Sequence, residues 1–309
     1  MSQKIFITRR IPEVGLKMLA GKGYEITVSP KDRPLSQREL IKFLKKGNYD
    51  GVLSLLTDLV DSKVFDAAPS VKIFANYAVG FNNIDSAEAK KRGIVVTNTP
   101  GGLTESVAEH TFALILSAAR NIPYAHASLT AGKWERSKFI GSELHGKSLG
   151  LAGFGRIGKE VGKRALAFEM KVLGHDIRDV GFPLVSKEEL LRQSDFVVLA
   201  SDLNQVSTHL ISTAEFSLMK PSAFLFNTAR GPIVDEAALV QALEHKIIAG
   251  AGLDVFEVEP LPADSPLRQM TNVVLTPHNA YNTVEAENYV HDNTMNNLVK
   301  GLNALSKTS

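Results

Sequence analysis

The sequence predicts an α/β protein with two doubly wound parallel-sheet domains. Short β-branched or apolar runs alternate with helical patterns along most of the chain, and a glycine-rich turn at 153–158 lies near its middle. Such alternation forms right-handed βαβ units, in which helices cover both faces of a parallel sheet. The 309 residues also suffice for two domains at roughly 150 residues each.

The first hundred residues contain one strand–helix series that can close a domain around its own core. The expected strands are Lys4–Thr8, Glu25–Val28, Gly51–Leu55, Val71–Ala75 and Ile94–Val96. Helices are expected near Pro12–Ala20 and Ser36–Lys46. A long apolar helix, Thr104–Ala119, follows two glycines, and we expect it to end at Arg120-Asn121-Ile122-Pro123 and to connect the domains.

A second series of six strands follows this helix. The strands are expected at Ser148–Ala152, Lys171–Gly174, Phe196–Ala200, Ala223–Asn227, Gly250–Asp254 and Val273–Thr276. The final amphipathic helix, Val284–Leu305, is expected to return to the first domain. We therefore predict one domain from residues 1–98 and 283–309, a second from 99–282, and a cleft between them.

Composition excludes several classes of protein. With 44% hydrophobic and 22% charged residues, the chain has ordinary globular composition. A net charge of +2, with basic and acidic residues interspersed, argues against nucleic-acid binding. The absence of cysteine excludes disulfides, iron–sulfur clusters and thiolate zinc sites, and no other spacing suggests a metal site. No apolar stretch reaches membrane-spanning length and residues 1–30 lack a signal-peptide pattern, so we expect a cytoplasmic protein.

A glycine motif follows the strand Ser148–Ala152. It reads Gly153-Phe154-Gly155-Arg156-Ile157-Gly158 and precedes a helical run and another strand. The first glycine of such a motif permits a tight turn, the second lets the backbone approach a pyrophosphate, and the third allows close helix–strand packing. The helix N-terminus adds amide donors and partial positive charge. In this context the motif predicts a dinucleotide site rather than a plain glycine turn.

Asp176 lies eighteen positions after Gly158, where a carboxylate can accept hydrogen bonds from the adenosine ribose hydroxyls. A 2′-phosphate about 4 Å from this carboxylate would meet repulsion of up to ~4 kcal/mol per unit charge at an effective dielectric near 20. Arg178 could offset part of that repulsion. We therefore expect a preference for NAD over NADP.

Three late strands are followed by unusual polar residues. The segments are Asn227–Gly231, Gly252–Pro260 and Leu275–Ala280. Ligands of open α/β sheets bind outside the carboxyl ends of the strands, so these segments are expected to form one site near a bound nicotinamide. His278 is suited to exchange a proton with an alcohol or carbonyl oxygen, and Glu259 to orient its ring and stabilise imidazolium. Arg230 supplies a charged planar fork for a carboxylate or a carbonyl.

Each of these residues is ambiguous alone. A single histidine is usually a surface or satisfied core residue, Glu259 could be a solvated loop acid, and Arg230 could form a structural ion pair. Their joint position after strands, beside a dinucleotide motif, favours a 2-oxo acid reductase. The other histidines are expected to be surface or satisfied core residues: His110, His126, His145, His175, His209, His245 and His291.

Ordered motifs along almost the whole chain resemble the D-isomer-specific 2-hydroxyacid dehydrogenase family. They are N-Y-A-V-G-F-N-N-I-D at 76–85, R-G-I-V-V-T-N-T-P-G at 92–101, G-F-G-R-I-G at 153–158, F-N-T-A-R-G-P-I-V-D-E at 226–236, A-G-L-D-V-F-E-V-E-P at 251–260 and T-P-H-N-A at 276–280. The resemblance implies a Rossmann NAD-binding domain beside a flavodoxin-like substrate domain, and a homodimer formed through the nucleotide domains.

The resemblance also implies roles for individual residues. Arg230, Glu259 and His278 would be catalytic, while Val79 and Gly80 would offer backbone amides to the substrate carboxylate. Asp254 would contact the nicotinamide amide. The residues implied to line the cofactor are Arg156, Ile157, Thr228 and Ala229, in addition to Gly153, Gly155, Gly158 and Asp176.

Within the family, the segments at 51–58, 76–80 and 259–262 look most like glyoxylate/hydroxypyruvate reductases. We therefore expect NADH to reduce a small 2-oxo acid, with a proton from His278. Phosphite oxidation is disfavoured, because those relatives carry lysine where this chain has Val79. A short-type phosphoglycerate dehydrogenase and a non-enzymatic NAD(H)-sensing protein remain alternatives, and the sequence does not identify the acid.

Two segments depart from the family pattern. Ala200–Gln205 replaces a His- or Cys-containing segment followed by Pro-Leu-Thr, which leaves the adenine-side contacts open. The stretch from Asp176 to Phe196 is short, so we expect one helix or strand there to be trimmed. Neither change affects Arg230, Glu259 or His278.

Overall fold

The computed structural model describes residues 2–11, 13–176 and 183–306. The chain forms two compact units, Met1–Leu103 with Thr283–Ser309, and Thr104–Asn282. Both units are α/β, as the sequence predicts. The first unit extends past residue 98, to Leu103. Two hydrogen bonds hold this segment: Thr99 donates its N–H to the Ala78 carbonyl (2.9 Å), and the Pro100 carbonyl accepts from the Tyr289 hydroxyl (2.9 Å).

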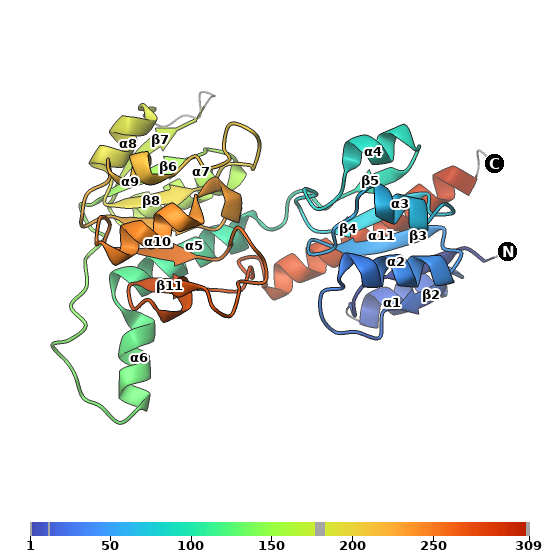
Figure 1. The fold of residues 1–309 in the computed structure, drawn as a ribbon, viewed down its shortest axis with the longest axis horizontal. Helices are drawn as coiled ribbons and strands as arrows, with labels where there is room; N and C mark the ends of the chain where they lie inside the picture. The colour runs from blue at the N-terminus through green and yellow to red at the C-terminus, as the bar shows by residue number, and fades with distance from the viewer. Residues whose placement is uncertain (1, 12, 177–182, 307–309) are drawn as a thin grey trace. The chain divides into compact units, whose positions relative to one another are not determined.

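The first unit has a five-stranded parallel sheet in the order β2-β1-β3-β4-β5, which is the flavodoxin-like order. Its strands are β1 (Lys4–Ile7), β2 (Glu25–Val28), β3 (Gly51–Leu55), β4 (Ile73–Tyr77) and β5 (Val95–Thr97). Its helices are α1 (Glu13–Gly21), α2 (Gln37–Lys46), α3 (Ser62–Ala67), α4 (Ser86–Lys91) and α11 (Val284–Ser306). Figure 1 shows α11 running along this sheet.

Both faces of this sheet are buried. Phe6, Val52 and Phe74 pack with side chains of α2, α3 and α4 on one face. The other face is covered by α11 and α1, and Gly51 leaves room for Leu298 and Leu302 of α11 there. Burial on both faces is the usual condition of a parallel sheet.

The second unit has a six-stranded parallel sheet in the order β11-β10-β9-β8-β6-β7. Its strands are β6 (Ser148–Ala152), β7 (Lys171–His175), β8 (Phe196–Leu199), β9 (Phe224–Asn227), β10 (Gly250–Leu253) and β11 (Val273–Leu275). Its helices are α5 (Thr104–Ala119), α6 (Ile122–Thr130), α7 (Arg156–Ala167), α8 (Lys187–Gln193), α9 (Thr213–Phe216) and α10 (Glu236–Glu244), with short 3-10 turns at Gly231–Ile233 and Pro266–Gln269.

This sheet reverses its winding between β6 and β8. Helices α5 and α7 contribute to the core on one face, and α8, α9 and α10 to the core on the other. Beyond β7, a single parallel bridge joins Gly174 to Leu184. The expected shortening between Asp176 and Phe196 stays a prediction, because residues 177–182 lie outside the described part of the chain. The point of reversal is where a doubly wound sheet opens a ligand crevice.

Helix α6 was not expected from the sequence. Asn121, just after α5, adopts a left-handed conformation (φ 54°) and separates α5 from α6. Pro123 lies in the first turn of α6, where its missing N–H costs no hydrogen bond. None of its residues is buried, so no apolar stripe revealed it. Figure 1 shows α6 and the following segment extending from the rest of this unit.

Along the described part of the chain, no helix combines the length and the apolar character that crossing a membrane requires. Within residues 2–11, 13–176 and 183–306, no three His, Asp or Glu side chains gather in an arrangement suited to a metal ion.

Candidate active site

The glycine turn joins β6 to α7. Gly153 has φ 100°, and a Cβ there would lie 2.6 Å from the backbone nitrogen of Ser201. A Cβ on Gly158 would lie 2.5 Å from the Gly153 carbonyl oxygen, which explains the close packing of the helix on the turn. Gly155 caps α7, and a Cβ there would meet open space. An open glycine at the N-terminus of a helix fits the pyrophosphate of a dinucleotide.

Asp176 follows β7 and turns back to this loop. One of its carboxylate oxygens accepts a hydrogen bond from the Phe154 N–H at 2.6 Å. This bond fixes the Asp176 side chain against the glycine turn. Arg156 in the first turn of α7 is exposed, and Ile157 is half-buried. Arg178, which was expected to weaken the discrimination against NADP, lies outside the described residues.

Arg230 follows β9 on a loop that Asn227 holds. The buried Asn227 side chain accepts the Ala229 N–H at 3.1 Å and donates to the Arg230 carbonyl at 2.9 Å. The Arg230 guanidinium donates to the Ala229 carbonyl at 2.6 Å. Burial lowers the pKa of Arg230, an effect opposed by the carboxylates of Glu259 and Asp202.

The loops after β9 and β10 are in direct contact. A Cβ on Gly231 would lie 1.9 Å from the carbonyl carbon and oxygen of Phe256. Only glycine therefore allows the segment that carries Arg230 to approach the segment that carries Glu259 this closely.

Glu259 and His278 form a pair. The Nδ1 atom of His278 lies 2.7 Å from one Glu259 carboxylate oxygen, and the Phe256 N–H donates to the other at 3.0 Å. Burial raises the pKa of Glu259, but His278, the Phe256 N–H and Arg230 together hold it below its ordinary value. The carboxylate is thus kept ionised beside the imidazole ring.

Asp254, at the end of β10, holds the loop that carries His278. Its buried carboxylate accepts hydrogen bonds from the Thr276 hydroxyl (2.6 Å) and from the N–H groups of Asn279 (3.0 Å) and Ala280 (2.9 Å). His278 itself has φ 53° and donates its N–H to the Asp254 carbonyl at 2.8 Å. The expected contact of Asp254 with nicotinamide stays a prediction.

Two neighbouring residues of α5 join this site without having been selected from the sequence. His110 contacts Thr276 and Asp254, and Thr111 contacts Thr228. No sequence signal separated His110 from the other polar residues in the first half of α5, and His110 was grouped with the surface or core histidines.

Val79 and Gly80 follow β4 in the first unit. The Val79 carbonyl accepts a hydrogen bond from the Asn98 side chain at 2.6 Å, and the Gly80 carbonyl accepts one from the Asn76 side chain at 2.8 Å. Within the described part of the chain, no hydrogen-bond acceptor was found for the N–H of either residue. The carbonyls are therefore restrained, while the two amides are available to an anion.

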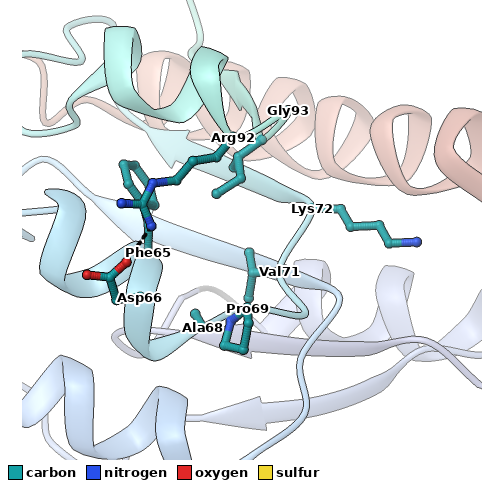
Figure 2. A pocket seen from close by; sticks show the side chains of 9 residues that line it. Phe65, Asp66, Ala68, Pro69, Val71, Lys72, Arg92 and Gly93 are labelled. Atoms are coloured by element: carbon teal, nitrogen blue, oxygen red, sulfur yellow. Dashed lines mark hydrogen bonds and ion pairs between the residues drawn. The ribbon is translucent and has the colours of Figure 1, made fainter.

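A separate hollow of about 430 Å³ lies at the amino-terminal ends of β4 and β5 in the first unit (Figure 2). The Arg92 guanidinium in its wall contacts Asp66 at 2.6 Å and Glu88 at 2.8 Å, and lies over the Phe65 ring. Its charge is already balanced by carboxylates, and none of the expected site residues lines this hollow.

Comparison with known proteins agrees with this geometry. Residues 112–280 match the NAD-binding domain of the D-isomer-specific 2-hydroxyacid dehydrogenases. The chain is 42% identical to a glyoxylate reductase of Korarchaeum cryptofilum, over 97% of this chain and 92% of that protein. It is 44% identical to a glyoxylate reductase of Thermofilum pendens, over 96% and 90% respectively. A Thermus thermophilus protein of known crystal structure superimposes with a TM-score of 0.91 at 37% identity, over 98% of this chain and 97% of that one.

The turn at Gly153–Gly158 lies within the matched residues, and its open helix N-terminus and the nearby Asp176 carboxylate are chemically suited to an NAD molecule. The chain therefore belongs to the D-isomer-specific 2-hydroxyacid dehydrogenase family and is an NAD-dependent oxidoreductase that acts on the CH–OH group of donors.

Proposed function

We propose that this enzyme reduces a small 2-oxo acid of the glyoxylate/hydroxypyruvate type, with His278 as the proton donor. The observation that carries the proposal is the 2.7 Å contact between His278 and Glu259 at the strand ends that also present Arg230. The relatives at 42% and 44% identity are named glyoxylate reductases, which supports the choice of acid.

In reduction, bound NADH supplies a hydride to the carbonyl carbon of the acid. His278, protonated and oriented by Glu259, gives a proton to the carbonyl oxygen as the C=O bond becomes C–O–H. Oxidation runs in reverse, with His278 accepting the hydroxyl proton. Glu259 stays ionised and orients the imidazole ring through its contact with Nδ1.

Two groups are proposed to hold the substrate carboxylate. The amides of Val79 and Gly80 supply neutral donors whose loop is restrained by Asn76 and Asn98. Arg230 supplies a planar charged fork that grips the carboxylate or polarises the carbonyl.

The residues proposed to bind the cofactor are Gly153, Gly155, Arg156, Ile157, Gly158, Asp176, Thr228, Ala229 and Asp254. The backbone of the turn and the start of α7 face the pyrophosphate, and Asp176 accepts hydrogen bonds from the adenosine ribose. Its negative charge supports a preference for NADH over NADPH.

The proposal is tested by following NADH oxidation with glyoxylate, hydroxypyruvate, pyruvate and 3-phosphohydroxypyruvate. Turnover of glyoxylate or hydroxypyruvate that is lost in His278→Ala supports it, provided that His245→Ala, at an exposed histidine after α10, keeps full activity. Turnover of 3-phosphohydroxypyruvate alone would contradict the proposed substrate and indicate a phosphoglycerate dehydrogenase instead. Tight NADH binding without turnover of any acid would favour a nucleotide sensor.

A homodimer formed through the nucleotide-binding units is part of the proposal. The segment from α6 to residue 140 exposes four large apolar side chains, Ile122, Leu129, Trp134 and Ile140, of which the last two are 84% exposed. Such a cluster on an extension supports an interface with a second copy. Sedimentation should show a dimer for the native chain and for Val14→Glu in the first unit, and a monomer for Trp134→Glu with Ile140→Glu.

We also propose a cytoplasmic location, because the reaction draws on the NADH of the cell interior. Fractionation of the native host with an antibody against the chain tests this, and enrichment outside the cytoplasmic fraction would contradict it.

A further inference from the structure

Helix α5 presents two adjacent polar side chains to two different loops of the second unit. The His110 Nε2 atom lies 3.0 Å from the Thr276 hydroxyl and 3.5 Å from a carboxylate oxygen of Asp254. The next residue, Thr111, is fully buried, and its hydroxyl lies 2.9 Å from that of Thr228. The first contact reaches the loop after β11 that carries His278, and the second reaches the loop after β9 that carries Arg230.

The direction of the hydrogen bond between His110 and Thr276 follows from which acceptor takes the Thr276 hydroxyl proton. Thr276 gives its single hydroxyl proton to an oxygen of the Asp254 carboxylate, at 2.6 Å. The Thr276 oxygen can then only accept, so the Nε2 atom of His110 carries a proton and donates it. The result is a chain of donors from His110 through Thr276 to Asp254.

Asp254 passes this restraint to His278. Its two oxygens also accept the N–H groups of Asn279 and Ala280, the two residues after His278. His278 itself adopts a left-handed conformation, which costs free energy in a non-glycine residue and persists only where the surroundings impose it. A fixed Asp254 therefore helps to hold the backbone from which the imidazole reaches Glu259.

The same reasoning gives the direction of the hydrogen bond between Thr111 and Thr228. Thr111 donates its hydroxyl proton to the Val107 carbonyl at 2.7 Å, so it accepts the hydrogen bond from Thr228. Thr228 begins the loop in which Asn227 holds the carbonyl of Arg230. One turn of α5 thus anchors the loop that carries His278 and the loop that carries Arg230.

We propose that α5 sets the placement of His278 relative to Arg230, with His110 as a positioning residue for His278 and Thr111 as a positioning residue for Arg230. This inference rests on the proposed function for its kinetic consequences. The restraint itself belongs to the folded unit, so it has a readout that requires no turnover.

Hydrogen exchange provides that readout. In His110→Ala the amides of Asn279 and Ala280 should exchange faster, because Asp254 loses one of the contacts that orient it. His110→Gln keeps an N–H donor near the same position and should retain protection close to the native level. Unchanged exchange in His110→Ala at these two amides overturns the inference, whatever the enzyme reduces.

Kinetics test the consequence for the reaction. In His110→Ala and Thr276→Val, kcat should fall roughly 10- to 100-fold through misplacement of the proton donor, with little change in the Kd of NADH. NADH deuterated at the transferred position should then show a larger isotope effect, because the chemical step becomes slower than release. His110→Gln should recover most of kcat, whereas Thr111→Val should mainly raise KM for the acid.

The double variant His110→Ala with Thr276→Val should lose no more kcat than the more impaired of the two single variants, because both changes act through one chain of contacts. A kcat loss that only follows a lower Tm, with an unchanged isotope effect, would assign His110 a purely structural role and overturn the inference. Activity that survives in His278→Ala would instead overturn the proposed function, and the exchange result would still decide whether α5 holds the loop.

Discussion

His278 Nδ1 and Glu259 Oε2 are 2.7 Å apart, although the two residues lie on loops that follow different strands. The other carboxylate oxygen accepts the Phe256 N–H. Because Nδ1 is engaged, Nε2 is the ring nitrogen left to exchange a proton with a substrate. This contact supports the proposal that His278 exchanges the proton and that Glu259 orients it.

Replacing Glu259 with Gln should make reduction more sensitive to pH. The pKa of Glu259 lies below its ordinary value, so in the native enzyme the stabilising carboxylate is fully present above about 4.5 and is lost only as pH falls through its lowered pKa. In Glu259→Gln we expect kcat at neutral pH to fall by roughly 10²-fold or more, on the scale of positioned proton transfer. The loss should grow as pH rises, because the neutral amide does not offset the positive charge that His278 carries before it gives up its proton.

The matched control is Glu257→Gln. Glu257 lies two residues away and contacts a different histidine, His209, at 2.7 Å. Its variant should keep the native pH profile of kcat/KM. A Glu259→Gln profile parallel to the native one at every pH would contradict the assigned role.

Arg230→Lys should weaken the grip on the 2-oxo acid. Lysine keeps the positive charge but loses the planar fork that matches a carboxylate. We expect kcat/KM to fall by roughly 10²-fold, in line with the 2–5 kcal/mol typical of disrupting a buried charged contact. Steady-state kinetics measure this, with Arg192→Lys on the exposed side of α8 as control. Equal losses in the two variants would refute a specific role for the guanidinium.

Gly231→Ala should separate two loops of the site. The new Cβ would lie 1.9 Å from backbone atoms of Phe256, so the segments that carry Arg230 and Glu259 must move apart. Overpacking of this kind costs about 1–3 kcal/mol of unfolding free energy, measurable by urea denaturation, and kcat should fall as well. Gly21→Ala is the control, because a Cβ there meets nothing within 4 Å. Native activity and stability in Gly231→Ala would show that the close contact is dispensable.

Asp176→Asn should shift cofactor preference toward NADPH. The variant removes the negative charge while its amide oxygen still accepts the Phe154 N–H. Relief of a repulsion of about 1–2 kcal/mol at a partly exposed position would raise the NADPH-to-NADH ratio of kcat/KM roughly tenfold. Asp264→Asn, at an exposed loop position, should leave the ratio unchanged. A native ratio in Asp176→Asn would show that another group selects the cofactor.

Local sequence pattern was sufficient for most of the fold. All six strands of the second unit begin and end within one residue of their expected positions, because each is a short apolar run bounded by polar or glycine residues. β4 was expected two residues too early, since Asn76 looks like the end of a strand. Asn76 is instead fully buried and satisfied by hydrogen bonds with Ser54, Gly80 and Asn83.

The sequence by itself therefore determined the alternating strands and helices, the dinucleotide turn, and which segments follow the strand ends. These properties depend on residues close together in the chain, through hydrophobic periodicity and the backbone freedom of glycine. The sequence also predicted that Glu259 orients His278, from their positions after neighbouring strands, but the 2.7 Å contact itself came only from the tertiary structure. The burial of Asp254 and the support from His110 had no counterpart in the sequence analysis. Sheet order and the turns of separate loops decide which side chains meet, and such contacts between residues far apart in the chain leave no local sequence pattern.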